Sequence, residues 1–400
     1  MNTKLMFYVK KTIDQWVLIT TTVFLLGYFL FPTTSKQNTF FYIGVCPAVV
    51  LLAFFYFKQL EIPNWIIVST VVFAAYLFLN STWSIHYSNE QTLTYLRYLF
   101  TTYCLIGAIF FVQYKREDYS SLLFKALILT GFFYYLHGIW EHFNTYENPL
   151  AIRYSDRPID EAIFAGMLLL ACFWWVLEEK SLSHKLGISA LSIPFIMILL
   201  LAKSRGPQIA FLISMPLVAY CQGFRLKKFL IYFIALAIIL LSVLLLSETA
   251  KQIFSRGLHF PYRGEIWRAS FYESLEYFWF GQGASHRPPI FIDSGEKFNH
   301  SHNILLAVFR MGGIVGVLLF LMNLCLCFIA GFKQRDSIIG LWGICLFFGI
   351  LCLMTNGQYP LTRPTSLWFA YWIPVAFIGA TTTCFKIDRV SHRRDDKLRV

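Results

Sequence analysis

Residues 303–330, NILLAVFRMGGIVGVLLFLMNLCLCFIA, form the longest apolar run of the chain, and this run decides the fold class. An α-helix rises about 1.5 Å per residue, so the run is long enough to cross the ~30 Å hydrocarbon core of a bilayer. Hydrocarbon offers the backbone no other hydrogen-bond partner, so a spanning run has to be helical. The run therefore predicts an integral membrane protein.

Eleven further runs along the chain have the same apolar character. With the first run they give twelve expected spans, at residues 15–31, 39–57, 64–80, 92–112, 121–142, 160–177, 186–202, 207–221, 228–247, 303–330, 337–355 and 366–385. The runs 186–202 and 207–221 are short, and only four residues separate them. The pattern predicts an all-α polytopic membrane protein, a single membrane domain of about twelve transmembrane helices over residues 1–400.

The composition of the chain supports this class. Of its 400 residues, 57% are hydrophobic and 14% are charged, whereas soluble domains carry about 25% charged residues. This excludes an ordinary soluble enzyme, a disordered protein, a nucleic-acid-binding protein and a disulfide scaffold. The nine cysteines lie in or beside apolar runs, so we expect packing residues and not disulfides. Residues 15–31 lack a small-residue cleavage site, so we expect an anchor and not a cleaved signal peptide.

The basic residues indicate how the chain is oriented. With the N-terminus inside and twelve crossings, 20 of the 34 Lys and Arg residues fall on the cytoplasmic side. Cytoplasmic loops carry an excess of these residues. Both termini are therefore expected in the cytoplasm, with residues 386–400 as a basic tail. The long hydrophilic loop over residues 248–302 is then expected outside, and loops of this length are usually functional.

Two arginines on the outer side stand out. Arg205 lies in the turn KSRGP, residues 203–207, between two expected spans, and Lys203 lies beside it. Charges close to a membrane surface favour a functional role over simple snorkelling. Arg263 begins an expected amphipathic helix near residues 263–280. An arginine at a helix N-terminus makes an anion site, and phosphate is the obvious ligand.

The same expected helix carries other candidate groups. Its apolar stripe consists of Trp267, Phe271, Leu275 and Phe278, which recur at helical spacing. We expect this stripe to lie on the outer membrane surface or under the loop, with anchoring as its main role. Arg268 either adds to the anion site or pairs with Glu265.

Two histidines come just before the run at 303–330, in the sequence NHSHN at residues 299–303. They allow three interpretations: surface or capping residues, metal ligands, or a general base. A metal site needs a third ligand, and the sequence has no DxD or HExxH motif, so no metal is predicted. A neutral imidazole can take the proton of an alcohol, and nearby arginines would keep it neutral. His300 and His302 are the candidate bases, and Asn303 and Arg153 are possible substrate-binding residues.

Three motifs occur in a recognisable order: LLLAKSRGPQIAFL at 199–212, RGEIWRASFYESLEYFWFGQGA at 263–284 and HSHNILLAVFRMGGIVGVLLF at 300–320. Together they resemble the bacterial O-antigen ligase and Wzy-type polymerase superfamily. The resemblance implies a GT-C-like glycosyltransferase of the inner membrane with a periplasmic active site. It implies an undecaprenyl-diphosphate-linked glycan as donor, lipid A–core as acceptor, and inverting transfer without metal or cofactor.

The resemblance also assigns roles to particular residues. The turn arginine corresponds to Arg205, the loop arginine to Arg263, and the histidine before the asparagine to His302. The chain departs from the family pattern in having a second histidine, His300. The ligase is the preferred function, a Wzy-type polymerase is the alternative, and a transporter or flippase is a third candidate. A transporter is expected to place charges near the membrane midplane, whereas here they gather outside. The expected partners are the two lipid-linked substrates and membrane lipids, without nucleic acid.

Overall fold

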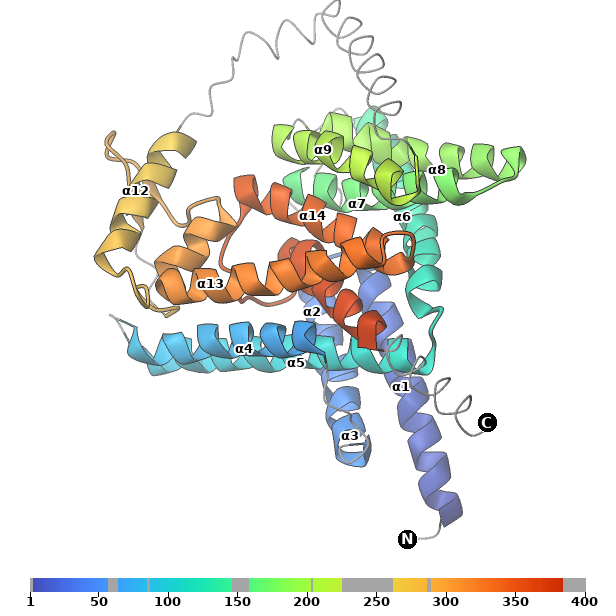
Figure 1. The fold of residues 1–400 in the computed structure, drawn as a ribbon, viewed down its shortest axis with the longest axis horizontal. Coiled ribbons are helices and arrows are strands. Elements are labelled where there is room, and N and C mark those ends of the chain that lie inside the picture. The colour runs from blue at the N-terminus through green and yellow to red at the C-terminus, as the bar shows by residue number, and fades with distance from the viewer. Residues whose placement is uncertain are drawn as a thin grey trace, which may run out of the picture.

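The computed structural model describes residues 3–56, 64–84, 87–145, 158–202, 204–224, 262–285 and 289–383. These parts of the chain are almost entirely helical (Figure 1). The helices are α1 (Thr3–Leu30), α2 (Thr34–Phe40), α3 (Cys46–Tyr56), α4 (Trp65–Asn80), α5 (Asn89–Lys115), α6 (Tyr119–Thr145), α7 (Pro158–Glu178), α8 (Leu182–Leu201), α9 (Arg205–Cys221), α12 (Arg263–Glu276), α13 (Ile304–Lys333) and α14 (Ile338–Asn356).

Shorter elements complete the described fold. Two π-helical turns, η1 (Phe41–Val45) and η4 (Trp368–Trp372), interrupt longer helical segments, and the 3₁₀ turn η3 (Ser81–Trp83) follows α4. The strands β1 (Ile290–Phe291) and β2 (Lys297–Phe298) pair antiparallel, with Ile290 opposite Phe298. The fold class expected from the sequence, a mostly helical polytopic membrane protein, is thereby confirmed in its coarse form.

Nine helices of the described chain are long and apolar enough to cross a membrane. They match nine of the twelve expected spans. Of the other three, residues 207–221 lie within α9, whose 17 residues extend about 25 Å, less than the ~30 Å hydrocarbon core. Residues 366–383 are helical through η4, and the expected span at 228–247 lies outside the described residues. The tail at 386–400 lies outside them as well.

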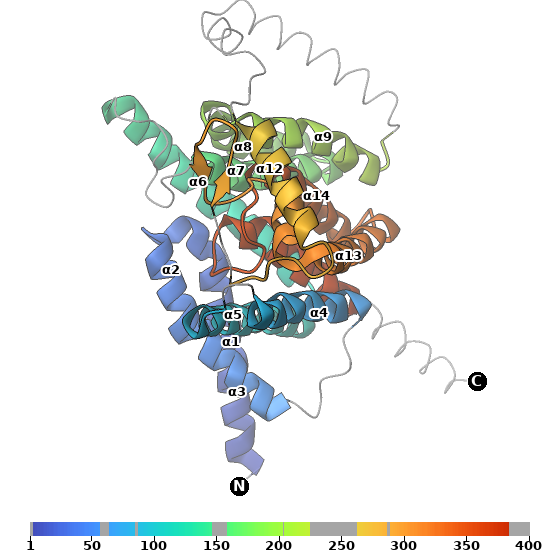
Figure 2. The ribbon, with the colours of Figure 1, turned by 90° about the vertical axis from the view of Figure 1, so that its left-hand side faces the viewer.

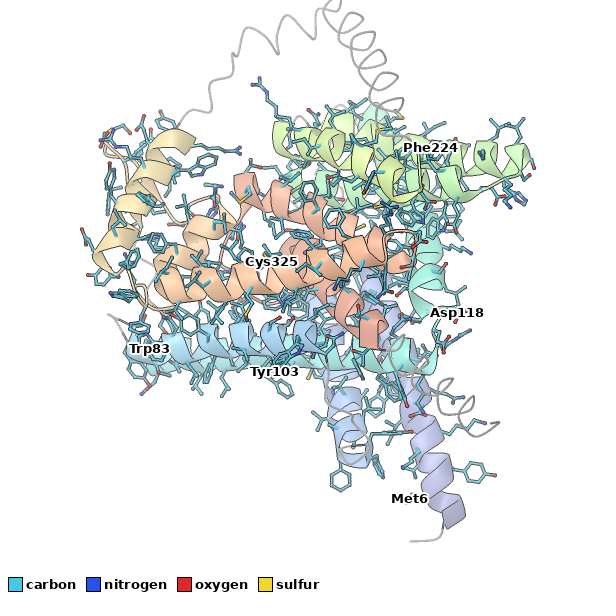
Figure 3. The ribbon with its side chains drawn as sticks, in the orientation of Figure 1. Met6, Trp83, Tyr103, Asp118, Phe224 and Cys325 are labelled. Carbon is cyan, nitrogen blue, oxygen red and sulfur yellow. The ribbon has the colours of Figure 1, made fainter. Side chains whose placement is uncertain are left out.

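The long helices α4, α5, α9, α13 and α14 lie roughly along the long axis of Figure 1, and α12 lies across one end. Figure 3 places Trp83 at this α12 end, and Asp118 and Phe224 at the opposite end, which we call the Asp118 end. Lys115 and Arg116 lie next to Asp118 in the chain. In the view of Figure 1, α1, α3 and α6 run across this long axis.

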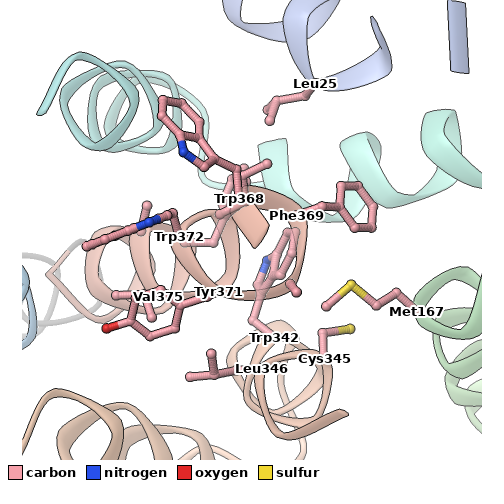
Figure 4. Packing of buried hydrophobic residues seen from close by; sticks show 14 of the residues in the cluster. Leu25, Met167, Trp342, Cys345, Leu346, Trp368, Phe369, Tyr371, Trp372 and Val375 are labelled. Atoms are coloured by element: carbon pink, nitrogen blue, oxygen red, sulfur yellow. The ribbon is translucent and has the colours of Figure 1, made fainter. Parts of the chain in front are cut away.

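The core of the bundle is built from aromatic rings around α14 and η4 (Figure 4). Trp342 of α14 stacks on Phe377 with a centroid distance of 4.4 Å and an interplanar angle of 3°. Stacked and edge-to-face rings contribute about 0.5–1.5 kcal/mol beyond the area they bury. All eight described cysteines are free, and seven of them are buried.

One polar network crosses this core. The side-chain amide of Asn323 in α13 donates to the hydroxyls of Ser69 (2.9 Å) and Thr70 (2.7 Å) in α4. The hydroxyl of Tyr371 in η4 donates to the carbonyl oxygen of the Asn323 side chain (2.8 Å). Such bonds between membrane helices contribute about 0.6 kcal/mol each on average. They fix α4, α13 and η4 in register.

Candidate active site

Three helices begin at the α12 end, and each carries one of the residues singled out from the sequence. Arg205 is the first residue of α9, Arg263 is the first residue of α12, and His302 directly precedes Asn303, the N-cap of α13. The first N–H groups of a helix have no partner within it, and the helix dipole is positive there. A group of helix N-termini with two guanidinium groups is suited to bind a multiply charged anion.

The end of α14 joins the start of α9 to the start of α13. Gly206, next to Arg205, lies so close to Thr355 that an added Cβ atom would collide with the threonine hydroxyl. Two residues after Thr355, Gly357 lies against the backbone nitrogen of Ile304, the first residue of α13. The segments that carry Arg205 and His302 are thus both brought to the end of α14.

A hydrogen bond ties the loop after α14 to the histidine segment. The hydroxyl of Tyr359 donates to the carbonyl of Asn299 (2.7 Å), one residue before His300. The rings of His300 and His302 have centroids 4.0 Å apart and an interplanar angle of 62°. Tyr359 was not singled out in the sequence, because no local pattern connects it with residues 60 positions away.

His302 itself has an unusual backbone conformation. Its φ of 51° lies in the left-handed region, which non-glycine residues rarely adopt. The next residue, Asn303, caps α13, with its side-chain oxygen accepting from the N–H groups of Leu305 (2.9 Å) and Leu306 (3.1 Å). The cap fixes the backbone beside His302 at the helix start, where the imidazole is half-buried. Asn303 is a possible substrate-binding residue, but its side-chain carbonyl oxygen already accepts the two hydrogen bonds of this cap.

The β-hairpin connects the start of α12 to the same histidines. Ile266 of α12 packs with Ile290 and Ile292 of the hairpin in a small apolar cluster. Tyr262, which precedes Arg263, lies against Phe298, with 6.0 Å between the ring centroids. His300 follows Phe298 by two residues, so the hairpin brings the start of α12 close to the histidine segment.

Two groups near this contact have shifted pKa values. Partial burial lowers the pKa of the Arg263 guanidinium from its ordinary value, although arginine stays protonated at any physiological pH. The carboxylate of Glu296, through its negative charge and a hydrogen bond, raises the pKa of Tyr262 above its ordinary value. Arg263 therefore remains positively charged although its guanidinium is partly buried.

The helix expected near 263–280 is present and spans Arg263–Glu276. Its buried positions are Ile266, Ser270 and Ser274. Phe271, Leu275 and Phe278 of the expected stripe are 45%, 42% and 39% exposed on the protein surface. The rings of Phe271 and Phe278 also lie against Phe309 of α13, with centroids 6.1 Å and 6.0 Å apart, so the stripe is partly exposed and partly in contact with the bundle.

Below the start of α12, the helix α13 is broken at Gly313, where φ is 60° and ψ is −162°. The segment after α12 fills the break with four backbone bonds. The N–H groups of Gln282 and Gly283 donate to the carbonyls of Arg310 (2.9 Å) and Met311 (3.0 Å). The N–H groups of Ile314 and Val315 donate to the carbonyls of Phe278 (2.8 Å) and Trp279 (3.3 Å). We call this contact, residues 277–285 with 310–315, the α12–α13 junction.

The other residues singled out from the sequence are Arg268, Lys203 and Arg153. Arg268 lies over the ring of Tyr272 at 6.0 Å, on an exposed part of α12. Lys203 and Arg153 lie outside the described residues. Within the described parts of the chain, no group of three or more His, Cys, Asp or Glu side chains could hold a metal ion.

Comparisons with known proteins indicate which family this chain resembles. The family model described as O-antigen ligase matches residues 189–321, a stretch that contains Arg205, Arg263 and His302. An O-antigen ligase of Pseudomonas aeruginosa is 25% identical over 382 residues, which cover 92% of this chain and 92% of that protein. The matched segment and the similarity along most of both chains show that this chain is similar to O-antigen ligases.

Proposed function

We propose that this protein is an O-antigen ligase, which transfers a glycan from undecaprenyl diphosphate to a sugar hydroxyl of lipid A–core. The observation that carries the proposal is the gathering of three helix starts with Arg205, Arg263 and His302 at the α12 end. The similarity to an O-antigen ligase along 92% of both chains favours the ligase over a Wzy-type polymerase. The match to the O-antigen ligase family model supports a transferase role in lipopolysaccharide biosynthesis.

The cationic groups account for donor binding. The donor's isoprenoid tail lies in the bilayer and its diphosphate at the membrane surface, where Arg205 and Arg263 begin their helices. Cleavage of the sugar–phosphate bond leaves negative charge on the departing diphosphate. Positive groups already in place stabilise that charge as it develops, without having to reorganise. A planar guanidinium also binds phosphate oxygens in pairs, which a lysine does not.

His302 is the proposed general base. It takes the proton of the acceptor hydroxyl as that oxygen attacks the anomeric carbon from the face opposite the diphosphate. One carbon–oxygen bond forms, the bond to the diphosphate breaks with its electron pair on the leaving phosphate, and the configuration inverts. General bases contribute about 10²–10⁴-fold to such steps. This mechanism uses side chains alone and needs no metal ion.

The site is proposed to face the periplasm, in the inner membrane, with both termini in the cytoplasm. The basic residues Lys115 and Arg116 at the Asp118 end support a cytoplasmic assignment of that end. Cysteine variants at Glu265 and Asp118 test the orientation. A membrane-impermeant thiol reagent added to the periplasmic side is expected to label Glu265→Cys and not Asp118→Cys. The opposite labelling would overturn the proposed location.

The function is tested with purified protein in lipid nanodiscs, supplied with an undecaprenyl-diphosphate-linked glycan and lipopolysaccharide that lacks O-antigen. We expect glycan-bearing lipopolysaccharide as the product on a gel, in equal amount with and without a chelator. A longer lipid-linked glycan in place of that product would indicate a polymerase. Activity lost on chelation and restored by divalent ions would contradict the metal-independent mechanism.

A further inference from the structure

An ion pair that the proposed mechanism does not use lies beside the α12–α13 junction, with a buried arginine and a partly buried carboxylate. Arg310, in the apolar run that defines the fold class, is 5% exposed. Its guanidinium lies 2.8 Å from the carboxylate of Glu273 in α12. The side-chain amide of Gln282 donates to the same carboxylate oxygen, also at 2.8 Å. A charge buried near the membrane is costly unless it is paired, so this arginine strongly favours one position of α12.

The ion pair lies beside backbone groups that the break in α13 leaves without helical partners. The segment after α12 bonds four of them, and the hydroxyl of Tyr76 in α4 donates to the carbonyl of Gly312 (2.5 Å). The side chain of Asn80 in turn donates to the carbonyl of Phe280 (2.7 Å). Broken helices persist at membrane depth only where such groups are satisfied by neighbouring protein. The junction is therefore tied to α4 and is a fixed point of the bundle.

Two helical arms extend from this fixed point, as Figures 1 and 2 show. One arm is α12, where Glu273 follows Arg263 by ten residues, or about 15 Å of helix. The other is the first part of α13, where Arg310 follows His302 by eight residues, or about 12 Å. Both arms run toward the junction, so their starts lie at similar distances from it.

We propose that Glu273 and Arg310 are positioning residues, whose ion pair sets the separation between Arg263 on one arm and His302 on the other. This inference rests on the proposed function, because it assigns the donor's diphosphate to the first arm and the acceptor's proton to the second. A change in the angle between the arms moves the phosphate clamp relative to the base. An error of about 1 Å in such an arrangement can lower turnover by up to about 100-fold.

The ion pair between Asp14 and Lys115 provides a matched control. It has a similar length, 2.9 Å, but it joins α1 to the end of α5, next to Asp118. Asp14→Asn and Glu273→Gln remove the same charge from pairs at opposite ends of the molecule. Arg310→Lys is the conservative variant, since it keeps the charge and loses the planar geometry.

Turnover is measured for each variant in nanodiscs. We expect Glu273→Gln to lower kcat by about 10–100-fold and to change the KM for the lipid-linked donor by less than about threefold, because Arg205 and Arg263 are still present. Arg310→Lys is expected to retain intermediate activity, and Asp14→Asn to behave like the unchanged protein. A kcat of Glu273→Gln equal to that of Asp14→Asn would overturn the inference.

A distance measurement separates the positioning role from the proposed function. Spin labels are attached at Glu265→Cys in α12 and Gln91→Cys in α5, both at exposed positions, with Cys325 and Cys384 changed to serine. Double electron–electron resonance should give a shifted or broader distance distribution in Glu273→Gln and an unchanged one in Asp14→Asn. An unchanged distribution in Glu273→Gln would overturn the inference even if activity fell. If the unchanged protein transfers no glycan, the proposed function fails, and these distances still decide whether the pair holds α12.

Discussion

The two ends of the molecule use the same kind of interaction in different surroundings. At the α12 end, Arg310 pairs with Glu273 where the two side chains are 6% and 27% exposed. At the Asp118 end, Lys115 pairs with Asp14 where they are 39% and 25% exposed. The first pair lies beside backbone hydrogen bonds that close a broken helix, whereas the second joins the interior of α1 to the end of α5. The two pairs therefore differ mainly in the burial of the cation. The pair with the buried arginine is the one we propose to fix the position of α12, and the more exposed pair mainly supports the contact between α1 and α5.

The same comparison extends to the backbone. At the α12 end, glycines with positive φ and a histidine with a φ of 51° surround the proposed site. Strained backbone of this kind is often found at functional sites. The aromatic core around α14 and η4 relies instead on ring packing between helical segments. Substitutions at the α12 end should accordingly affect activity before stability, and those in the aromatic core the reverse.

The largest effect is expected for His302. Replacement by alanine removes the proposed base and should lower kcat by at least about 100-fold, with the protein still folded. His184→Ala, at a 72% exposed position near the start of α8, is the control and should keep full activity. Steady-state rates of both variants, with His300→Ala beside them, check the assignment. Normal turnover of His302→Ala together with loss in His300→Ala would transfer the role of base to His300.

Lysine substitutions of the two arginines should give the next largest effect. Arg205→Lys and Arg263→Lys keep the charge but lose the paired donors that bind phosphate oxygens, so kcat/KM for the donor should fall by about 10-fold or more. Arg116→Lys, at the Asp118 end, makes the same chemical change away from the site and should be neutral. Equal activity in all three variants would mean that a point charge is sufficient at the α12 end.

A glycine pair tests whether the junction needs its close backbone contact. Gly281 and Gly295 both have positive φ, at 69° and 81°. An added Cβ atom at Gly281 would collide with the backbone of Met311, whereas the space around Gly295 is open. Gly295→Ala should cost only about 1–2 kcal/mol of conformational strain, and Gly281→Ala clearly more. Thermal unfolding of the purified variants measures the difference, and equal melting temperatures would show that the junction tolerates displacement.

The smallest effect on stability is expected at the Asp118 end. Partly exposed ion pairs contribute about 0–1 kcal/mol, so Asp14→Asn should lower the melting temperature only slightly. Removing one partner of a buried pair costs about 3–5 kcal/mol, so Glu273→Gln should lower it more. The two unfolding curves, recorded in the same detergent, compare the pairs directly. Equal shifts would mean that burial at the junction does not distinguish them.

Much of this architecture could be predicted from the sequence. Hydropathy predicted the nine spans found among the described residues. The free energy of placing a helix in hydrocarbon is close to the sum of the contributions of its own residues, so it can be read from the sequence. The amphipathic helix beginning at Arg263 was also predicted, since its apolar residues recur at helical spacing. The apolar run at 303–330 was predicted as one span, and the break at Gly313 was missed. Nothing local indicates that a segment some 30 residues earlier supplies the backbone partners for that break.

The sequence by itself determined that this chain crosses a membrane many times and carries arginines and histidines between its spans, because these properties depend on residue type and short-range spacing. Only the tertiary structure decided that Arg205, Arg263 and His302 lie at or just before the starts of three helices at one end. It also decided that Ser270 and Ser274 are buried in α12, and that Glu273 pairs with Arg310. Those contacts join residues 37 or more positions apart. Their formation depends on how whole helices pack, which no local pattern encodes.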